Sequence, residues 1–209
     1  MIETNTGKTE KHARNRDRLA LAAQEVLQER GYARTAMRDI AAKAGVPLGT
    51  LHYYFSGKSE LLIHSFHMQQ VNFIASIRSA ITESSNHNNL IERVAEVWMR
   101  ELVTDAPKYR LWYDLRNQAL FDAELQPAVK NMEALHGKVI LELAIAVTGR
   151  SSDIVRPEVM EFILPQLGGL FFHHVQTMAF GTRIDPEAIK LSFLRAFKLL
   201  LTAEERRDC

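Results

Sequence analysis

The sequence predicts an all-α protein in which a small N-terminal helical domain precedes a larger helical domain. Three observations lead to this prediction. Apolar residues recur at intervals of three and four along most of the 209 residues, which is the period of an amphipathic helix. Signals that end or begin helices separate these stretches, at Gly31, Gly149 and Asp185-Pro186. Residues 35–58 have the pattern of two short helices around a tight turn.

The first helix is expected to run from Arg14 to Arg30, because residues at helical spacing give it one apolar face: Leu19, Ala22, Ala23, Val26 and Leu27. Arg14 and Arg16 lie near its start. They are either solvated surface side chains or a basic arm that follows a DNA backbone, and the two interpretations weigh about equally. Residues 1–12 are polar and lack the apolar core of a signal peptide, so we expect a disordered arm there.

Residues 35–58 predict a helix-turn-helix. Thr35 is expected to cap the first helix, Gly45 to end it in a left-handed conformation, and Pro47 to open the second. Three residues of the second helix are expected to face inward: Leu51, Tyr54 and Phe55. The N-terminal side chains of that helix are then free to enter the DNA major groove. The alternative is an ordinary helical hairpin in another class of α-helical protein.

The same stretch resembles a known family, the tetracycline-repressor (TetR/AcrR) family of transcriptional regulators, over residues 13–62. The residues that carry the resemblance are Gly31-Tyr32, Thr35, Ile40-Ala41, Ala44-Gly45-Val46, Gly49-Thr50-Leu51, Tyr54-Phe55, Lys58 and Leu61-Leu62. In the rest of the chain the resemblance is only that of a long all-helical domain. It implies a homodimeric DNA-binding regulator in which the helix after the motif transmits an effector signal.

The sequence departs from the common family pattern at three positions. Pro47 and Leu48 stand where a polar or basic residue is usual, and His52 stands where tyrosine is usual. Apolar contacts would replace hydrogen bonds at Pro47 and Leu48. We therefore expect an altered base preference and an unchanged mode of binding.

Ten residues are expected to contact DNA: Thr35, Arg38, Pro47, Leu48, Gly49, Thr50, His52, Tyr53, Tyr54 and Lys58. Arg38 can reach a phosphate or a base edge, and Thr50 can bond either one or place its methyl group against that of thymine. Lys58 opens the next helix, where free N–H groups and its own charge can hold a phosphate. Tyr54 is a core residue, a backbone contact, or both.

The distribution of charge agrees with a DNA-binding N-terminus. The whole chain carries a formal charge of +1, but residues 1–60 hold ten Lys and Arg against seven Asp and Glu. The balance is +3 there and −2 in the rest of the chain. The basic excess thus lies in the segment proposed to meet phosphate.

Beyond the motif, helices are expected over residues 58–82, 90–102, 109–121 and 123–147, with a loop at 84–89 and a stop or restart at Pro107. The expected domains are a disordered arm at 1–12, a helix-turn-helix DNA-binding domain at 13–57, and an effector-binding and dimerisation domain at 58–205.

The last two helices, expected at 157–180 and 185–201, are apolar on more than one side. One core absorbs only one face of a helix, so we expect the second face to be buried against another copy of the chain. The expected interface residues are Leu164, Gly168, Phe172, Leu191, Leu194 and Phe197. A two-fold homodimer would read a palindromic operator in double-stranded DNA.

A small-molecule effector is expected to bind within the larger domain. Apolar lining is expected from Trp98, Trp112, Tyr113, Met132, Phe171 and Met178, with polar anchors from Arg116, His136 and His174. Each of these residues is more often plain core or surface than ligand contact. The mixture favours a largely apolar or aromatic ligand with one polar or acidic group.

Other classes of function lack support. The sequence has no nucleophile elbow, phosphate-binding loop, paired catalytic carboxylates or dinucleotide fingerprint, so neither an enzyme nor a cofactor is predicted. His173 and His174 point about 100° apart on a helix, so no metal site is predicted. Cys209 is the single cysteine, and no apolar run would span a membrane, so we expect a cytoplasmic protein. The alternative function is an all-helical small-molecule-binding or interaction protein without specific DNA binding.

Overall fold

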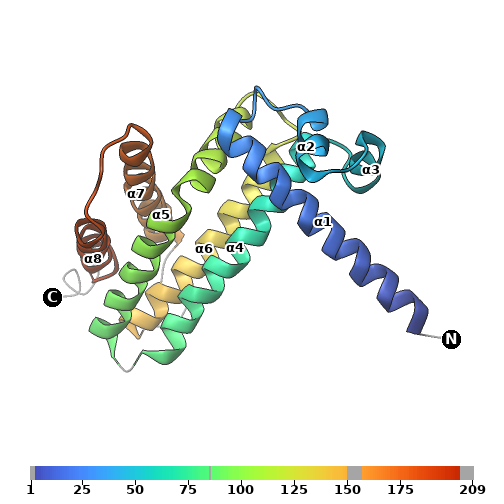
Figure 1. Ribbon diagram of the computed structural model, residues 1–209. Helices are drawn as coiled ribbons and strands as arrows, with labels where there is room; N and C mark the ends of the chain where they lie inside the picture. The colour runs from blue at the N-terminus through green and yellow to red at the C-terminus, as the bar shows by residue number, and fades with distance from the viewer. Residues whose placement is uncertain (1–2, 85, 150–156, 203–209) are drawn as a thin grey trace. The chain divides into compact units, whose positions relative to one another are not determined.

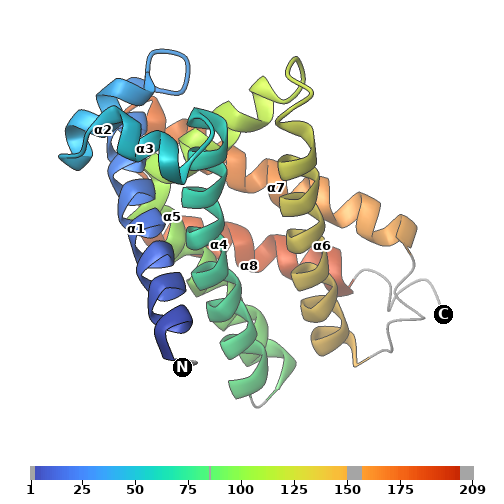
Figure 2. The same ribbon diagram turned by 90° about the vertical axis from the view of Figure 1, so that its right-hand side faces the viewer.

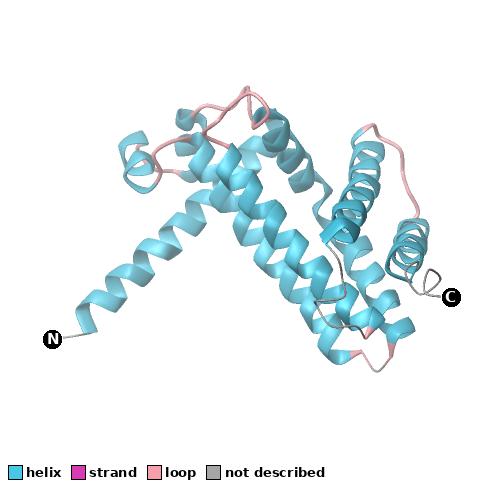
Figure 3. Ribbon diagram, turned by 180° about the vertical axis from the view of Figure 1, so that it is seen from behind, coloured by secondary structure: helices cyan, strands magenta, loops and turns pink. Residues whose placement is uncertain are grey.

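The computed structural model describes residues 3–84, 86–149 and 157–202, and over these residues the protein is all-α, as predicted. Figure 3 shows helices and loops throughout this part of the chain. The helices are α1 (Glu3–Arg30), α2 (Met37–Ala44), α3 (Leu48–Tyr54), α4 (Lys58–Glu83), α5 (His87–Gln118), α6 (Gln126–Thr148), α7 (Pro157–Ala179) and α8 (Pro186–Thr202).

The described residues form two compact units. Unit 1 comprises the chain up to Gln70 together with Leu111–Val129, and unit 2 comprises Val71–Arg110 and the chain from Lys130 onward. The expected domain boundary at residues 57–58 thus falls inside unit 1. Because α4 runs from Lys58 to Glu83, this one helix contributes residues to both units.

The first helix begins at Glu3, earlier than the Arg14 that the sequence suggested, so the predicted disordered arm is wrong for residues 3–12. Two contacts favour the longer helix. The Glu10 carboxylate lies 3.7 Å from the Arg14 guanidinium one turn later, and the His12 ring lies 4.8 Å from that of Tyr54 on α3. The segment was expected to be disordered because it is polar, but Glu10 and Arg14 are opposite charges four residues apart, a spacing that favours a helix.

Pro107 lies inside α5, so the two helices predicted around it are one helix of 32 residues. A proline in a helix interior costs about 3 kcal/mol or more, because a backbone hydrogen bond is lost and the ring crowds the preceding turn. Here Leu102, Ala106 and Tyr109 form a buried face that continues through the proline. Their packing offsets that cost.

The helix ends follow local capping chemistry. The predicted loop shortens because the Asn86 side chain accepts a hydrogen bond from Asn89 N at 2.9 Å and starts α5 at His87. The helix expected from residue 123 begins at Gln126, because Asp122 Oδ1 accepts from Glu124 N at 2.9 Å in a preceding turn. Gly149 follows α6 with φ 65°, and Asp185 Oδ1 accepts from Glu187 N at 3.1 Å at the start of α8, both as predicted.

An aromatic cluster forms the core of unit 2. The Trp98 ring of α5 lies edge-on to Phe171 of α7 at 5.5 Å and to Phe193 and Phe197 of α8 at 5.0 and 5.2 Å. Phe73 of α4 joins it at 6.0 Å. These contacts bury α5 against α7 and α8, which also pack on each other (Figure 1).

Candidate nucleic-acid interface

Two short helices and a tight turn form the centre of the predicted motif. Figure 2 shows α2 and α3 side by side, next to α1. Gly45 ends α2 with φ 66°, a left-handed conformation that glycine adopts without strain, and Pro47 with φ −58° directly precedes α3. Thr50 N and Leu51 N donate to the Pro47 carbonyl at 2.9 and 3.3 Å and start α3. The predicted helix-turn-helix is therefore present at the predicted residues.

Thr35 does not cap α2, which corrects the prediction. Ala36 is the N-cap, and Asp39 Oδ2 accepts from Ala36 N at 2.9 Å. Thr35 is only 3% exposed, and its hydroxyl donates to the Gly31 carbonyl at 2.8 Å. A side chain turned inward in this way is unavailable to DNA, so Thr35 acts on the motif by closing the turn before α2.

The outward face of α3 carries the side chains expected to meet DNA. Leu51 and Phe55 are buried beneath the helix, as predicted. Above them, Thr50 is half-buried, and five other residues of the predicted set are exposed: Pro47, Leu48, Gly49, His52 and Tyr53. Tyr53 is 73% exposed although it is a large aromatic residue. This face is free to contact an external partner.

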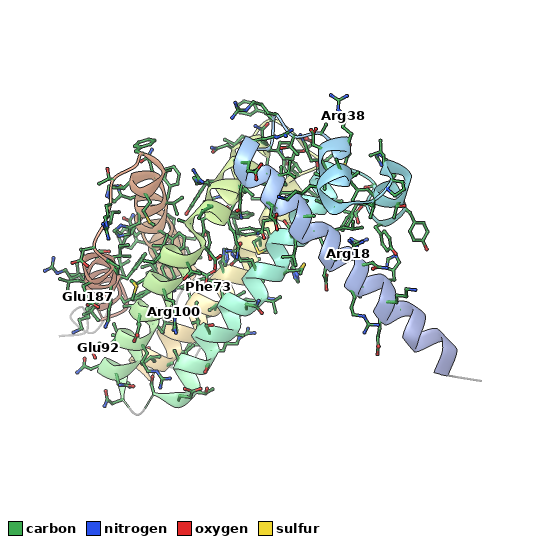
Figure 4. All side chains as sticks on the ribbon, in the orientation of Figure 1. Arg18, Arg38, Phe73, Glu92, Arg100 and Glu187 are labelled. Atoms are coloured by element: carbon green, nitrogen blue, oxygen red, sulfur yellow. The ribbon has the colours of Figure 1, made fainter. Side chains whose placement is uncertain are left out.

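Arg38 supplies a free positive charge on α2. Figure 4 shows its side chain projecting outward from the helix. It is exposed, and within the described part of the chain no ion pair or hydrogen bond occupies its guanidinium. Such a group can reach a phosphate or a base edge without losing an internal partner.

Lys58 has an internal role that the sequence did not reveal. Its Nζ donates to the carbonyls of Tyr32 and Thr35 at 2.5 and 2.9 Å and lies 3.9 Å from the centre of the Tyr32 ring. Burial lowers the pKa of the Lys58 ammonium, and the Asp114 carboxylate opposes this effect. An ammonium has three N–H groups, and two are used here. Lys58 is thus held against the turn before α2 and is not the mobile charge that we predicted, whereas its contact with phosphate stays a prediction.

Tyr54 faces α1, which supports a core role, whereas its contact with the DNA backbone stays a prediction. Its hydroxyl accepts from Asn15 Nδ2 at 2.9 Å and its carbonyl accepts from Arg16 at 2.8 Å. Arg16 also donates to Glu60 Oε1 at 2.8 Å and lies 4.4 Å from the centre of the Phe55 ring. Arg16 is thus engaged inside unit 1, whereas the exposed Arg14 remains a surface side chain.

Asp114 was missed entirely by sequence reasoning. Its Oδ2 accepts from Tyr32 N at 3.0 Å, across 82 residues of chain. The bond belongs to unit 1, which contains both residues. It fixes the same turn that Lys58 clamps. No local signal in the sequence pairs an acidic residue of α5 with a backbone group ahead of α2.

The motif matches a family described as "Bacterial regulatory proteins, tetR family", and the match covers residues 20–64. It contains the end of α1, the whole of α2 and α3, and the first turns of α4. Over these residues the chain is similar to members of that family.

Two relatives are similar to the N-terminal part of this chain. The HTH-type transcriptional activator FasR of Mycolicibacterium smegmatis is 29% identical over 99 residues, which is 47% of this chain and 45% of FasR. The fatty acid metabolism regulator protein of Bacillus subtilis is 38% identical over 64 residues, which is 31% of this chain and 33% of that protein. The chain spans less than half of the length of either relative.

The fold agrees with a solved structure over nearly the whole chain. The transcriptional regulator FadR from Bacillus subtilis, solved in complex with stearoyl-CoA, has a TM-score of 0.72 and 21% identity. The comparison covers 88% of this chain and 97% of FadR. At this identity the likeness establishes that the two chains share a fold.

The residues expected to line an effector pocket fall into both units. Unit 2 contains Trp98, Met132, His136, Phe171, His174 and Met178, whereas unit 1 contains Trp112, Tyr113 and Arg116. Trp112 stacks on Phe66 at 4.6 Å. Burial raises the pKa of the Tyr113 hydroxyl to about 12, although the Arg116 guanidinium opposes the rise. The structure thus brings Trp98 and Phe171 together. Beside them lie Phe193 and Phe197, which were not among the expected pocket residues.

The residues expected at a dimer interface are only partly accessible. Phe172 and Leu191 are exposed, and Leu164, Gly168 and Leu194 are half-buried. Phe197 is a correction: it is fully buried against Trp98, so it is unavailable to a second copy. Three further apolar residues of unit 2 are exposed on α7, on α8 or just after α7: Phe162, Phe180 and Leu199.

A groove lies on the surface of unit 2, between α4 and α5. Its volume is about 470 Å³, and its lining is largely polar: Ala75, Ser76, Ser79, Ala80, Arg93, Glu96, Val97 and Arg100. Figure 4 labels Arg100 on this side of α5. Over the described residues, no helix is long and apolar enough to cross a membrane, and no cluster of three metal-ligating side chains occurs.

Proposed function

We propose that this chain is a ligand-responsive transcriptional regulator that binds operator DNA as a homodimer and represses transcription until an effector releases it. The observation that carries the proposal is the exposed face of α3, with Thr50, His52 and Tyr53, set on the buried Leu51 and Phe55. The family match over residues 20–64 supports the same interpretation.

DNA recognition would use two kinds of contact. Arg38, whose guanidinium is free within the described residues, would pair with a phosphate or the edge of a guanine. Thr50, His52 and Tyr53 would contact bases and phosphates from the outward face of α3. Thr35 and Lys58 would contribute indirectly, because both hold the turn that sets the position of α2.

Dimerisation would use the exposed apolar residues of unit 2. Phe172 of α7 and Leu191 of α8 are both exposed, and α7 packs on α8. Burying such residues against the same surface of a second copy gives a two-fold dimer. Two recognition helices about 34–36 Å apart then fit a palindromic operator with one half-site per helical turn.

The effector would be a small, largely apolar molecule that binds in unit 2. The aromatic cluster around Trp98 provides apolar surface there. The names of two similar proteins support a ligand with an acyl chain, since one regulates fatty acid metabolism and another was solved with stearoyl-CoA. Because α4 has residues in both units, an effector that favours a different packing of α4 would change the population that binds DNA.

The test is a binding series on DNA from the chain's own upstream region, beside a scrambled duplex, at several salt concentrations. Specific binding should weaken with salt, and Arg38→Ala should reduce the salt slope by about 0.9 if one phosphate contact is lost. Thr50→Ala should instead relax base preference. Arg110→Ala is the matched control, because Arg110 is also an exposed arginine but lies in unit 2.

Two results would contradict the proposal. One is equal affinity for every fragment in a genome-wide selection, which would favour a helical interaction protein without specific DNA binding. The other is equal loss of affinity in Arg38→Ala and Arg110→Ala, which would place the DNA surface away from α2 and α3.

A further inference from the structure

Two polar atoms in the core of unit 2 lack a hydrogen-bond partner among the residues that the structure describes. They are Nε1 of Trp98 on α5 and Nδ1 of His174 on α7. Each side chain is only 7% exposed, so bulk water does not reach either atom. Buried polar groups in proteins are nearly always paired, and an unpaired one costs free energy that a partner would recover.

The hydrogen bonds around His174 fix which of its nitrogens carries the proton. Ser192 Oγ donates its single hydrogen to the Ile189 carbonyl at 2.7 Å. The same oxygen lies 2.7 Å from His174 Nε2 and must therefore accept there. Nε2 is the N–H of the neutral ring, so Nδ1 presents a lone pair. Nδ1 is a buried acceptor without a donor.

The Trp98 atom has the opposite character, because an indole N–H only donates. Both rings pack edge-on against the same side chain, Phe193 of α8, with centroid distances of 5.0 Å from Trp98 and 5.4 Å from His174. Phe193 is fully buried. A free donor and a free acceptor thus flank one apolar side chain, which can satisfy neither.

The surroundings favour an uncharged occupant. Phe171 and Phe197 also pack on the Trp98 ring, and neither can compensate a buried charge. Burial lowers the pKa of His174, and the neighbouring His173 lowers it further, so the imidazole stays neutral at pH 7. The site therefore provides neither a cation for a carboxylate nor an anion for an amine.

We propose that Trp98 and His174 are the polar anchors of the effector site, and that the effector carries an uncharged hydroxyl or primary amide on an apolar body. Its oxygen accepts from Trp98 Nε1–H, its O–H or N–H donates to His174 Nδ1, and its apolar part takes the place of the Phe193 ring. This inference rests on the proposed function in one respect, namely that unit 2 binds the effector.

The test measures ligand binding without DNA. In a Trp112→Phe background, Trp98 is the only tryptophan, so its fluorescence reports directly on the site. Three probes of similar length are compared: 1-octanol, which donates and accepts, methyl heptyl ether, which only accepts, and octanoate, which is charged. We expect 1-octanol to bind about tenfold more tightly than the ether, as one buried hydrogen bond predicts. Octanoate should bind more weakly than 1-octanol.

Two variants test the assigned roles. His174→Phe removes the acceptor and should bring the affinity ratio of alcohol to ether close to one. Ser192→Ala is milder: it removes the acceptor that holds the proton on Nε2, so the Nδ1–H form becomes accessible and the ratio should fall. His173→Phe is the control, because the exposed His173 lies next to His174 and should leave the ratio unchanged.

Equal affinity for alcohol and ether, an unchanged ratio in Ser192→Ala, or preferred binding of octanoate would overturn the assignment. Failure of all three probes to bind, in protein that still binds its operator, would also overturn it and leave the proposed function intact. If the protein bound the probes but no operator, the proposed function would be contradicted. The probe affinities would still test whether Trp98 and His174 anchor the ligand.

Discussion

The guanidinium of Arg16 donates to Glu60 Oε1 at 2.8 Å and so joins the middle of α1 to the first turn of α4. The other carboxylate oxygen of Glu60 accepts from the backbone N and the hydroxyl of Ser56, at 2.8 and 2.9 Å. One acidic side chain therefore holds α1, the turn after α3 and the start of α4 together. An ionised carboxylate can accept all three of these hydrogen bonds, because both of its oxygens are acceptors.

Acid should weaken the fold through Glu60. Partial burial raises the pKa of the Glu60 carboxyl, but the hydrogen bonds from Ser56 and Arg16 outweigh burial and leave the pKa below its usual 4.5. A carboxyl with a depressed folded-state pKa stabilises the fold above its unfolded pKa, and that stabilisation is lost as the pH falls through the folded value. We expect Glu60→Gln to lower Tm at pH 7 and to reduce the further fall of Tm below pH 4.5.

The control is Glu92→Gln, since Glu92 is an exposed acidic residue on α5 (Figure 4). Its curve of Tm against pH should coincide with that of the wild type. Parallel curves for the wild type and Glu60→Gln, displaced only by a constant, would show that Glu60 does not titrate in this range.

Lys58→Met should affect stability more than phosphate binding. It leaves the Tyr32 and Thr35 carbonyls without their shared donor, which should lower the free energy of unfolding by about 1–3 kcal/mol. Urea denaturation measures this loss. The salt slope of operator binding should match that of the wild type, because no phosphate contact is removed. If the Lys58→Met protein were as stable as the wild type and its salt slope were smaller, the result would instead support a direct contact between Lys58 and phosphate.

The adjacent residues Tyr53 and Tyr54 should respond in opposite ways. Tyr53→Ala removes an exposed side chain, so Tm should barely change while operator affinity falls several-fold. Tyr54→Phe removes the hydroxyl that accepts from Asn15, which should cost about 0.5–1.5 kcal/mol of stability. Thermal unfolding and DNA titration of both variants separate the two roles. An unaffected operator affinity in Tyr53→Ala would exclude Tyr53 from the interface.

A charge placed on the exposed apolar residues of unit 2 should separate the proposed dimer. Phe172→Glu and Leu191→Glu each put a carboxylate where a second copy would bury apolar surface. Light scattering should then show a smaller mass and DNA titration a weaker affinity. Phe121→Glu is the control, because Phe121 is 91% exposed but lies in unit 1. A dimer that survives both Phe172→Glu and Leu191→Glu would place the interface elsewhere.

The fold class, the helix-turn-helix and most helix ends could be predicted from the sequence, because their signals are local. Gly45 and Pro47 mark the turn within a few residues of the helices that they separate. The roles of Lys58 and Arg16 could not be predicted, since their partners lie 23–44 residues away and were chosen by packing. The helix break predicted at Pro107 was wrong for the same reason, because the packing of the buried face around it outweighs the local effect of the proline.

The effector residues were the least predictable. An apolar residue at helical spacing can face any neighbour, and composition does not say which. Trp98 and Trp112 were grouped together from the sequence, yet they belong to different units. Phe193 and Ser192 were not considered, although the hydrogen bond to Ser192 decides the proton position on His174.

The bond between Asp114 and Tyr32 limits how the chain can be recombined with its relatives. If only the first 57 residues were exchanged with a relative, the turn before α2 and Asp114 would come from different proteins. The exchanged segment would keep its candidate recognition helix but lose the hydrogen bond between Tyr32 N and the Asp114 carboxylate. A workable exchange would carry Leu111–Val129 with the N-terminal segment, because the unit that contains the candidate recognition helix is assembled from two separate stretches of the sequence.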